Sequence, residues 1–342
     1  MAQGDPMKIL VTGGAGYIGS TICSALEDAG HIPVILDSLV TGRVEFTRGR
    51  IFYQADIADR NAVENLFRDH ADIQATIHCA ALIVIPESVA NPYRYYHENV
   101  GKSMEFFHTL QELGFPQVVF SSSASLYDTV PGFMVTETSP LNPTSPYART
   151  KFMMEMVLKD FCASNGLLGI ALRYFNPIGA DPKMRSGLHL KDPSHAIAKL
   201  VEVQLGRLPQ FTITGTDYPT RDGTGIRDYI HVWDLAQAHV KAVVDFKGVF
   251  EQAGNPPENY LVINLGTGRG VTVRELVTAF EKVVGQPIHK VEGARRPGDS
   301  AGSFTNADKA KKLLGWETQL SIEQAIADAL KWGELKEQLL KY

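Results

Sequence analysis

Short apolar runs alternate with longer amphipathic stretches through the first half of the chain. Residues 8–12 form a β-branched run that stops at two glycines, and residues 32–36 form a second apolar run. The amphipathic stretch 17–29 lies between them and ends at Gly30, a residue type that often follows a helix. Strands that are buried on both faces of a sheet are apolar throughout. The pattern therefore predicts a strand, a helix and a second, parallel strand.

The same alternation continues as far as residue 174. Further strands are expected at 50–54, 75–78, 117–121 and 168–174, and further helices at 62–69, 95–113 and 145–164. A strand–helix repeat of this spacing predicts an α/β fold, namely a doubly wound parallel sheet of the Rossmann type with helices on both faces.

Glycine, proline and aspartate divide the chain into shorter elements between residues 177 and 225. An apolar strand pattern returns at 260–265, and two helical stretches follow at 273–284 and 322–330. We therefore expect a smaller, C-terminal substrate domain that is interleaved with the first domain. The predicted boundaries are 7–176 and about 228–265 for the first domain, and about 177–227 and 266–342 for the second.

The composition is that of an ordinary globular protein, with 44% hydrophobic and 21% charged residues among 342. A net charge of −5 offers no broad cationic surface, so nucleic acid is not expected as a partner. The three cysteines lack any metal-ligand spacing, and we expect reduced thiols and no metal site. No apolar run reaches the roughly 18 residues of a membrane helix, and residues 1–6 do not resemble a secretory signal. The expected location is the cytoplasm, away from any membrane.

Gly13, Gly14, Gly16 and Gly19 occupy the turn between the first strand and the first helix. Glycines at this spacing allow a tight turn and a close approach of the backbone to a pyrophosphate at the helix N-terminus. Asp37 closes the second strand, where a carboxylate binds ribose hydroxyls and repels a 2′-phosphate. The segment therefore predicts a dinucleotide site that prefers NAD to NADP.

Tyr147 and Lys151 stand four residues apart in a helical stretch, so they share one helix face with about 5 to 6 Å between their Cβ atoms. A nearby ammonium and an oxidised nicotinamide both stabilise a phenolate, which suits a tyrosine for acid/base chemistry. The serines at 121–123 follow an apolar strand at the sheet edge where ligands of such folds bind. A serine hydroxyl there can hydrogen-bond a substrate oxygen, and local turn bonds are the alternative role.

Five motifs occur in order along the chain: TGGAGYIG, SSSAS, YxxxK, RYFNPIGA and GIRDYIHV. With them the chain resembles the extended short-chain dehydrogenase/reductase superfamily over residues 8–330 and, within it, the UDP-glucose 4-epimerases. The resemblance implies NAD as the cofactor, UDP-sugars as substrates, and a homodimer formed through the helices at 95–113 and 145–164. It also implies three catalytic residues, which are Ser123, Tyr147 and Lys151.

The resemblance assigns further residues to the two ligands. The implied NAD contacts are Gly13, Gly16, Tyr17, Ile18, Gly19, Asp37, Ser38, Asp56, Ile57, Ala80, Asn99, Tyr147, Lys151 and Tyr174. The implied substrate contacts are Ser123, Tyr147, Asn176, Thr212, Thr214, Arg227, Arg296, Asp299 and Ser303. Judged from its position alone, Asp56 is an equally good N-cap for the next helix. The arginines also suit a diphosphate on chemical grounds, because a guanidinium binds it in a bidentate manner.

The implied reaction interconverts UDP-glucose and UDP-galactose at C4. Tyr147 takes the proton of the 4-hydroxyl while NAD accepts hydride from C4, and the resulting 4-keto sugar turns over before hydride returns to its opposite face. NAD is thereby regenerated in each turnover.

The chain departs from the superfamily pattern in three places. Ile83 stands where many members have lysine, and Pro86 stands where glycine is usual, so one NAD contact differs. Ser303 replaces a frequent bulky tyrosine beside the hexose, which predicts room for an N-acetyl group and activity on UDP-GlcNAc and UDP-GalNAc. The polar segment 212–214 replaces a more apolar strand that is expected near the uracil.

Other functions share parts of this pattern. A nucleotide-sugar 4,6-dehydratase usually has Asp-Glu after the active hydroxyl residue, whereas Ala124 and Ser125 follow Ser123 here. An epimerase for UDP-xylose or UDP-glucuronate shares every motif and stays open as an alternative. A dehydrogenase that releases NADH and a catalytically silent NAD-sensing protein are alternatives on the same fold, although silent proteins commonly lose the tyrosine or the lysine.

Overall fold

The computed structural model of the protein describes residues 5–164, 166–191, 193, 195–295 and 300–341. The strands of its central sheet are β1 (Lys8–Thr12), β2 (Ile32–Asp37), β3 (Ile51–Gln54), β4 (Ile73–His78), β5 (Gln117–Ser121), β7 (Leu168–Tyr174) and β12 (Tyr260–Leu265). They are arranged in the order β12-β7-β5-β4-β1-β2-β3, and every pairing is parallel. The predicted doubly wound parallel sheet is therefore confirmed.

The strand order reverses in the middle of this sheet. β1 is hydrogen-bonded to β2 on one side and to β4 on the other. The chain first builds outward from β1 to β3 and then, from β4, builds in the opposite direction. The loops after the carboxyl ends of β1 and β4 diverge, and the crevice between such loops is where ligands of this fold bind.

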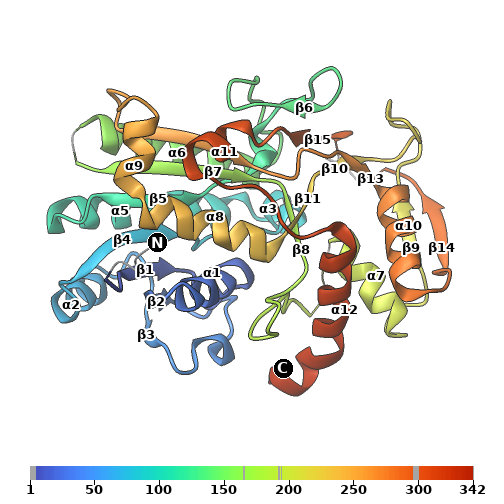
Figure 1. Ribbon diagram of the computed structural model, residues 1–342, viewed down its shortest axis with the longest axis horizontal. Coiled ribbons are helices and arrows are strands. Elements are labelled where there is room, and N and C mark those ends of the chain that lie inside the picture. The colour runs from blue at the N-terminus through green and yellow to red at the C-terminus, as the bar shows by residue number, and fades with distance from the viewer. Residues whose placement is uncertain (1–4, 165, 192, 194, 296–299, 342) are drawn as a thin grey trace.

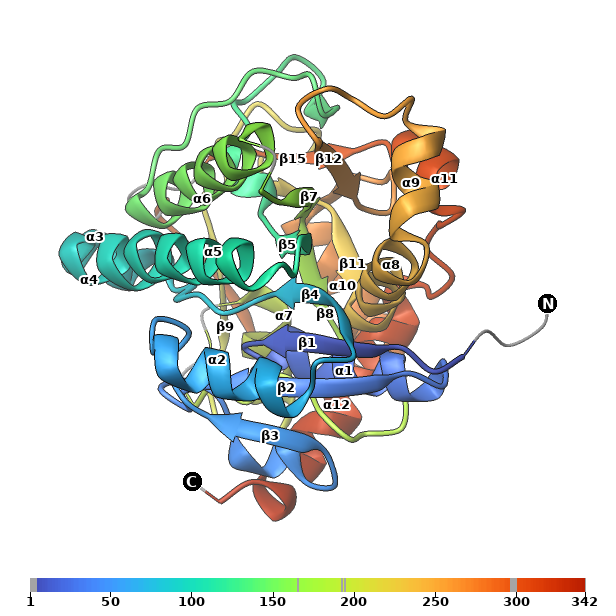
Figure 2. The same cartoon turned by 90° about the vertical axis from the view of Figure 1, so that its left-hand side faces the viewer.

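Helices cover both faces of the sheet (Figures 1 and 2). They are α1 (Tyr17–Asp28), α2 (Arg60–Asp69), α5 (Lys102–Leu113), α6 (Pro146–Ala163), α8 (Val232–Val244), α9 (Phe246–Gln252) and α11 (Asp308–Leu314). Because side chains alternate along a strand, Ile9 and Val11 of β1 pack with α1 and α8, whereas Leu10 packs with α2, α5 and α6. Both faces of the sheet are therefore buried in apolar cores, as the continuous apolar runs predicted.

One predicted helix differs in detail. The stretch expected at 95–113 begins earlier, with α3 (Ile85–Ala90) and α4 (Pro92–Tyr95), and continues through a π-helical segment, η2 (Tyr96–Gly101), into α5. A π turn widens the helix locally, and here it turns the buried Asn99 inward. The hydrophobic pattern alone does not distinguish this turn from an ordinary α-helical one.

The remaining helices and strands lie beside the large sheet (Figure 1) and enclose an apolar core of their own, which we call the second core. The two cores on the faces of the large sheet are together called the first core. The helices around the second core are α7 (Ala196–Gln204), α10 (Val273–Val284) and α12 (Ile322–Leu339), and its strands are β6 (Met134–Val135), β8 (Asn176–Ile178), β9 (Phe211–Thr214), β10 (Ile226–Arg227), β11 (Tyr229–His231), β13 (Val271–Thr272), β14 (Lys290–Gly293) and β15 (Gly302–Thr305). These strands form small sheets, of which the largest is β13-β10-β15-β6. Two short 3-10 segments, η1 (Val44–Thr47) and η3 (Ala124–Leu126), complete the elements.

Each of the two parts of the molecule contains one element from the stretch of chain that mainly forms the other part. β6 comes from the first half of the chain and pairs with β15, while α11 packs onto the core of the large sheet through Ala310 and Leu313. Among the described helices, none has the length and apolarity that crossing a bilayer requires.

Candidate active site

The glycine loop between β1 and α1 is shaped by close backbone contacts. Gly13 has φ of +70°, and a Cβ atom added there would lie 2.8 Å from the amide nitrogen of Ala80. A Cβ on Gly19 would lie 2.2 Å from the carbonyl oxygen of Gly13. Helix α1 starts at Tyr17, and its N-cap, Gly16, supplies no side-chain hydrogen bond. The amides of the first turn are thus left for an anion, which fits a pyrophosphate.

Asp37 lies at the carboxyl end of β2 with 8% of its surface exposed. One carboxylate oxygen accepts a hydrogen bond from the Ala15 amide at 2.9 Å, and the other accepts one from the Leu39 amide at 2.8 Å. Burial raises the pKa of this carboxyl group, and the two amide bonds oppose that rise. The neighbouring Ser38 is exposed. A carboxylate held rigidly beside the glycine loop suits the ribose of an adenosine.

Asp56 forms an ion pair rather than a helix cap. Its Oδ2 lies 2.6 Å from Nζ of Lys102, and its Oδ1 accepts a hydrogen bond from the Ala58 amide at 2.9 Å. The N-cap of α2 is Asp59, whose side chain accepts from the Ala62 amide. The N-cap interpretation of Asp56 is therefore wrong, because the helix starts three residues later than it requires. Ile57 is buried in the core beneath.

Asn99 braces the loop after β4. Its Oδ1 accepts from the Leu82 amide at 2.7 Å, and its Nδ2 donates to the Leu82 carbonyl at 3.0 Å and to Oγ1 of Thr150 at 3.0 Å. These bonds hold the segment containing Ala80 against Gly13. Asn99 therefore shapes the cofactor crevice through its neighbours. Ile83, in the same segment, has 44% of its surface exposed.

The end of β5 and the start of α6 form the reactive part of the site. Ser145 caps α6 by accepting from the Ala148 amide at 3.1 Å, which places Tyr147 in the first turn. Lys151, one turn later, donates from Nζ to the Ser121 carbonyl at 2.9 Å. The Ser123 side chain lies close enough to Tyr147 to favour its phenolate, and its Oγ accepts a local hydrogen bond from the Ser125 amide at 3.1 Å. The structure thus places Ser123 at the end of β5 and Tyr147 and Lys151 on the helix that lies against it, and the four-residue spacing of the last two puts them on one helix face as predicted.

Burial alters the proton affinities of this group. It raises the pKa of Tyr147, and the Ser123 side chain works in the opposite direction. It lowers the pKa of the Lys151 ammonium to about 8. The two side chains are 8% and 1% exposed. Both groups are therefore sensitive to any further charge that enters the crevice, because a buried pair is poorly screened.

Two predicted substrate residues are neighbours across strands. Arg227 on β10 stands opposite Ser303 on β15 in a parallel register. The Arg227 guanidinium donates to the carbonyls of Ile226 and Ala301 at 2.8 and 3.1 Å. Asn176 begins β8, and its amide donates to the carbonyl of Asp228, the residue after Arg227, at 2.9 Å. Arg296 and Asp299 lie outside the described residues.

Thr212 and Thr214 occupy alternate positions of β9, so they share the face opposite the buried Phe211 and Ile213. An open hollow of about 450 Å³ adjoins the ends of β9 and β14, lined by residues 215–217 and 292–295. Arg295 lies in its wall and bonds Asp217 through Nε at 2.7 Å. The polar threonines thus lie close to a space large enough for part of a nucleotide.

The sequence comparisons cover nearly the whole chain. The family model described as the NAD dependent epimerase/dehydratase family matches residues 9–255. The chain belongs to this family. It is 42% identical over 336 residues to a UDP-glucose 4-epimerase of Bacillus subtilis, with 95% of this chain and 96% of the relative covered. It is 40% identical to the enzyme of the same name from Rhizobium meliloti, with 97% and 98% covered.

Solved structures have the same fold. A UDP-glucose-4-epimerase from Stenotrophomonas maltophila, with bound NAD and formylated UDP-arabinopyranose, superposes with a TM-score of 0.90 at 38% identity, covering 97% of this chain and 99% of that one. The UDP-Glc/GlcNAc 4-epimerase of Campylobacter jejuni gives 0.79 at 33% identity, covering 96% and 99%. Membership of the family makes NAD the cofactor, and the glycine loop, the open first turn of α1 and Asp37 fit it.

Sequence reasoning missed His239 on α8, which supports the strand end that carries the serines in this member of the family. Its Nε2 lies 2.9 Å from Oγ of Ser121, and its Nδ1 lies 2.9 Å from the Leu235 carbonyl. The Cys79 thiol is 3.1 Å from the same serine oxygen, and the Tyr174 ring centroid is 6.2 Å from that of His239. Burial lowers the pKa of His239 to about 4, so it stays neutral. Nothing in the local sequence around residue 239 indicates this contact.

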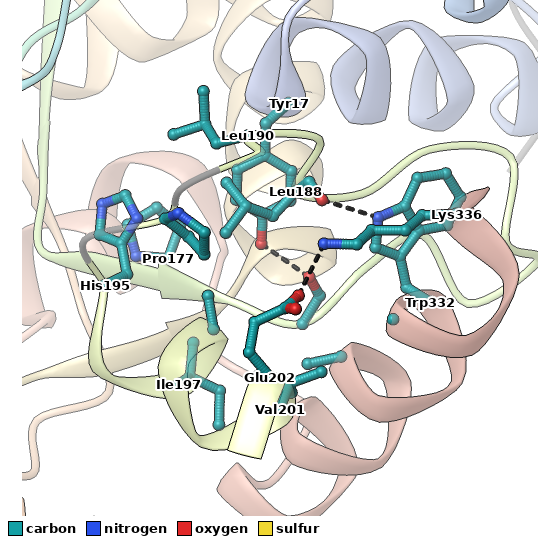
Figure 3. Close-up of a pocket in the computed structure, with 15 residues that line it drawn as sticks. Tyr17, Pro177, Leu188, Leu190, His195, Ile197, Val201, Glu202, Trp332 and Lys336 are labelled. Atoms are coloured by element: carbon teal, nitrogen blue, oxygen red, sulfur yellow. Dashed lines mark hydrogen bonds and ion pairs between the residues drawn. The ribbon is translucent and has the colours of Figure 1, made fainter. Parts of the chain in front are cut away.

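A small cavity of about 40 Å³ lies between α1, α7 and α12 and is separate from the catalytic group (Figure 3). Tyr17 reaches its wall, and the Tyr17 hydroxyl donates to the Gly179 carbonyl at 2.7 Å. Lys336 and Glu202 form an ion pair at 2.8 Å across it. The side chain of Tyr17 thus ties α1 to the second core, whereas its backbone lies in the first turn of the cofactor helix.

Proposed function

We propose that the protein is a UDP-glucose 4-epimerase that interconverts UDP-glucose and UDP-galactose with bound NAD. The observation that carries the proposal is the meeting of Ser123, Tyr147 and Lys151 at the end of β5, at the same edge of the sheet as the glycine loop and separated from β1 only by β4. Relatives that match almost end to end bear the name of this activity. The side chains proposed to bind the sugar oxygen and the loop proposed to bind NAD therefore lie at the same edge of the sheet.

When bound, NAD supplies a reversible two-electron oxidation at C4 of the sugar. Tyr147 accepts the proton of the 4-hydroxyl and holds it while C4 is a ketone. Ser123 hydrogen-bonds the same sugar oxygen and the tyrosine, which keeps the proton path short. Tyr147 then returns the proton after the ketone has turned over in the crevice, and the configuration at C4 is inverted.

Lys151 makes this proton transfer possible at neutral pH. Burial alone raises the pKa of Tyr147, which opposes its action as a base. A cation one helical turn away favours the phenolate, and each unit by which the pKa falls corresponds to about 1.4 kcal/mol. The Ser121 carbonyl holds the ammonium at 2.9 Å and so fixes its position behind the tyrosine.

We propose that residues of the second core bind the nucleotide part of the substrate. Arg227, Arg296 and Asp299 bind the diphosphate and ribose, with Asn176 and the threonines at 212 and 214 on the sugar and base sides. Charged donors on the diphosphate hold the nucleotide firmly while the hexose stays free to turn. We propose that the first core carries NAD and the second the sugar nucleotide, although α11 from the predicted second domain packs on the first core and β6 from the predicted first domain pairs with β15.

We further propose activity on the N-acetylated pair, UDP-GlcNAc and UDP-GalNAc. Ser303 stands beside Arg227 and is only partly buried. A serine leaves more volume than a tyrosine next to the sugar C2. The relative from Campylobacter jejuni, whose name includes both Glc and GlcNAc, has the same fold.

We propose a homodimer through α5 and α6. Met104, Met153 and Met156 on these helices are 43%, 40% and 51% exposed, and Val89 and Tyr93 nearby are 63% and 78% exposed. Apolar side chains gathered on adjacent helices favour association with a second copy.

The unpaired cysteines fit a reducing compartment, and we place the enzyme in the cytoplasm.

The decisive test incubates the purified protein separately with UDP-galactose and UDP-GalNAc, without added NAD, and resolves the products by chromatography. We expect UDP-glucose from the first and UDP-GlcNAc from the second. In a parallel incubation with added NAD, NADH that accumulates in step with product would instead indicate a dehydrogenase. A complete absence of product from UDP-galactose, even after NAD is added, would refute the epimerase assignment.

A further inference from the structure

A buried ion pair lies behind the catalytic helix. Glu155 follows Tyr147 and Lys151 at four-residue steps, so the three share one face of α6. Its carboxylate pairs with the Arg173 guanidinium on β7 at 2.8 and 2.6 Å and accepts the hydroxyl hydrogen of Ser122. Both members of the pair are 4% exposed. The ion pair therefore fastens α6 to the strand end that presents the catalytic serine.

Hydrogen bonds continue from this pair toward the second core. Arg173 donates to the Tyr127 hydroxyl at 3.1 Å, and Tyr127 donates to Oδ1 of Asn264 at 2.6 Å. The Asn264 amide donates to Oγ1 of Thr305 at 3.0 Å, and the Thr305 backbone amide donates to Asp228 at 3.3 Å. None of these five side chains is more than 8% exposed. They form an unbroken buried path, which we call the Arg173 path.

The Arg173 path ends where we propose that the substrate binds. Asp228 directly follows Arg227, and Thr305 lies two residues beyond Ser303 on β15. Since β10 and β15 are hydrogen-bonded in register, a shift of either strand moves the end of the path. β12, which carries Asn264, pairs with β7, which carries Arg173, and its Asn264 bonds Thr305 of β15.

Stability alone does not require such a path. A buried ion pair replaced by packed apolar residues is often neutral or more stable, whereas a polar network restricts its members to one arrangement. We propose that Arg173 and Tyr127 are positioning residues, which couple the seating of the sugar nucleotide on β10 and β15 to the placement of Tyr147 on α6. This proposal rests on the proposed function.

The substitution Tyr127→Phe tests the path with the loss of a single oxygen atom. The ring keeps its stacking on Phe175, at 6.5 Å between centroids, while the link from Arg173 to Asn264 is broken. The matched control is Tyr53→Phe, which removes a hydroxyl that donates to Asp69 at 3.0 Å on the edge strand β3.

Hydrogen exchange of the NAD-saturated protein, with and without UDP, measures the coupling without any need for turnover. In the wild type and in Tyr53→Phe we expect UDP to slow exchange both in 302–305 and in 146–155. In Tyr127→Phe we expect protection of 302–305 to remain and protection of 146–155 to be lost. In turnover of UDP-galactose, Tyr127→Phe should lower kcat about tenfold and change KM less than about twofold.

A double variant distinguishes a shared path from two separate defects. If Tyr127→Phe and Thr305→Val interrupt the same path, the double variant should have about the same kcat as the worse single variant. Effects that multiply, or UDP protection of 302–305 without any change in 146–155 of the wild type, would overturn the coupling while leaving the proposed function intact. A wild type in which UDP protects neither segment would overturn both.

Discussion

The roles that we propose for Tyr147, Lys151 and Ser123 depend on the groups that contact each of these side chains. The tyrosine is buried, which raises its pKa, and the Ser123 side chain opposes that rise, while Lys151 donates to the Ser121 carbonyl. The lysine is held by a backbone carbonyl, so its charge has a fixed position.

We expect Tyr147→Phe to lower epimerase turnover by about 10²- to 10⁴-fold, because the variant has no group that accepts the 4-hydroxyl proton. Since the hydroxyl is lost without a change in ring volume, the fold should be unaffected. The measurement is initial rate with UDP-galactose, with thermal unfolding as a check on the fold and Tyr53→Phe as the control. Full activity of Tyr147→Phe would contradict the mechanism.

Ser303→Tyr tests the origin of specificity. We expect the variant to keep activity on UDP-galactose and to lose about tenfold or more of its kcat/KM for UDP-GalNAc, because the added ring occupies the space of the N-acetyl group. Ser303→Ala, which keeps the small volume, should retain both activities. Equal losses on both substrates would show that volume at this position does not select the sugar.

At the scale of elements, the backbones of the glycine loop, the start of α1 and the segment after β4 are in close contact, so their positions depend on one another. Gly19 lets α1 pack against the loop, and Gly13 lets the segment after β4 approach. Asn99 in the π turn of η2 then fixes that segment from its other side. The shape of the proposed NAD site therefore depends on how closely these three backbone segments approach one another.

Gly19→Ala should weaken NAD binding by at least about tenfold, because its Cβ would approach the Gly13 carbonyl oxygen to 2.2 Å and displace the loop. Gly101→Ala is the control, since an added Cβ there meets its nearest atom at 4.0 Å. The amount of NAD that stays with each purified protein, determined by chromatography after denaturation, provides the comparison. Equal retention in both variants would contradict a steric role for Gly19.

His78 joins β4 to its neighbours, with Nδ1 2.7 Å from Oγ1 of Thr12 and Nε2 3.0 Å from Oγ of Ser103. Burial, with a smaller effect from Lys151, lowers its pKa from 6.5 to about 3. Between these two values the unfolded chain binds a proton that the folded protein does not. The contribution of His78 to stability is therefore fully present above pH 6.5 and is lost as pH falls toward 3.

His78→Asn should consequently be more harmful at pH 7 than at pH 4.5. We expect the gap in the free energy of unfolding between wild type and variant to narrow on acidification, at up to about 1.4 kcal/mol per pH unit. Urea unfolding at the two pH values measures it. A gap that stays constant would show that the residue does not titrate differently in the two states.

At the scale of the whole molecule, several contacts connect the first core with the second core. Tyr17 bonds Gly179, β6 pairs with β15, and the Arg173 path connects α6 with β10. We propose that these links let the first core carry NAD and the second carry the nucleotide sugar, with C4 within reach of the tyrosine. The opposite side of α5 and α6 remains exposed.

That exposed side provides a prediction about assembly. Met153→Glu combined with Met156→Glu should convert the proposed homodimer to a monomer, because two charges on each copy would be buried in the interface. Met134→Glu, at a methionine on β6 that is 50% exposed, should leave the dimer intact. Sedimentation velocity at several concentrations distinguishes these outcomes. A wild type that is monomeric at every concentration would contradict the dimer.

Much of this protein could be derived from local patterns. The buried strands, the glycine turn and the shared face of Tyr147 and Lys151 follow from side-chain periodicity and backbone sterics, which act over a few residues. The predicted positions agreed with the structure for that reason. The N-cap interpretation of Asp56 failed for the same reason, since several acidic residues near a helix start satisfy the pattern equally.

Only the tertiary structure decided which distant side chains meet. Ser121 and His239 are separated by 118 positions, and Tyr127 and Asn264 by 137. Their pairing depends on strand order and on helices crossing the sheet, which no local pattern encodes. The same holds for Asn99 in the π turn, whose hydrogen-bond partners Leu82 and Thr150 lie 17 and 51 positions away. The amino-acid sequence by itself determined the elements and the reactive groups, and packing determined how those groups are held.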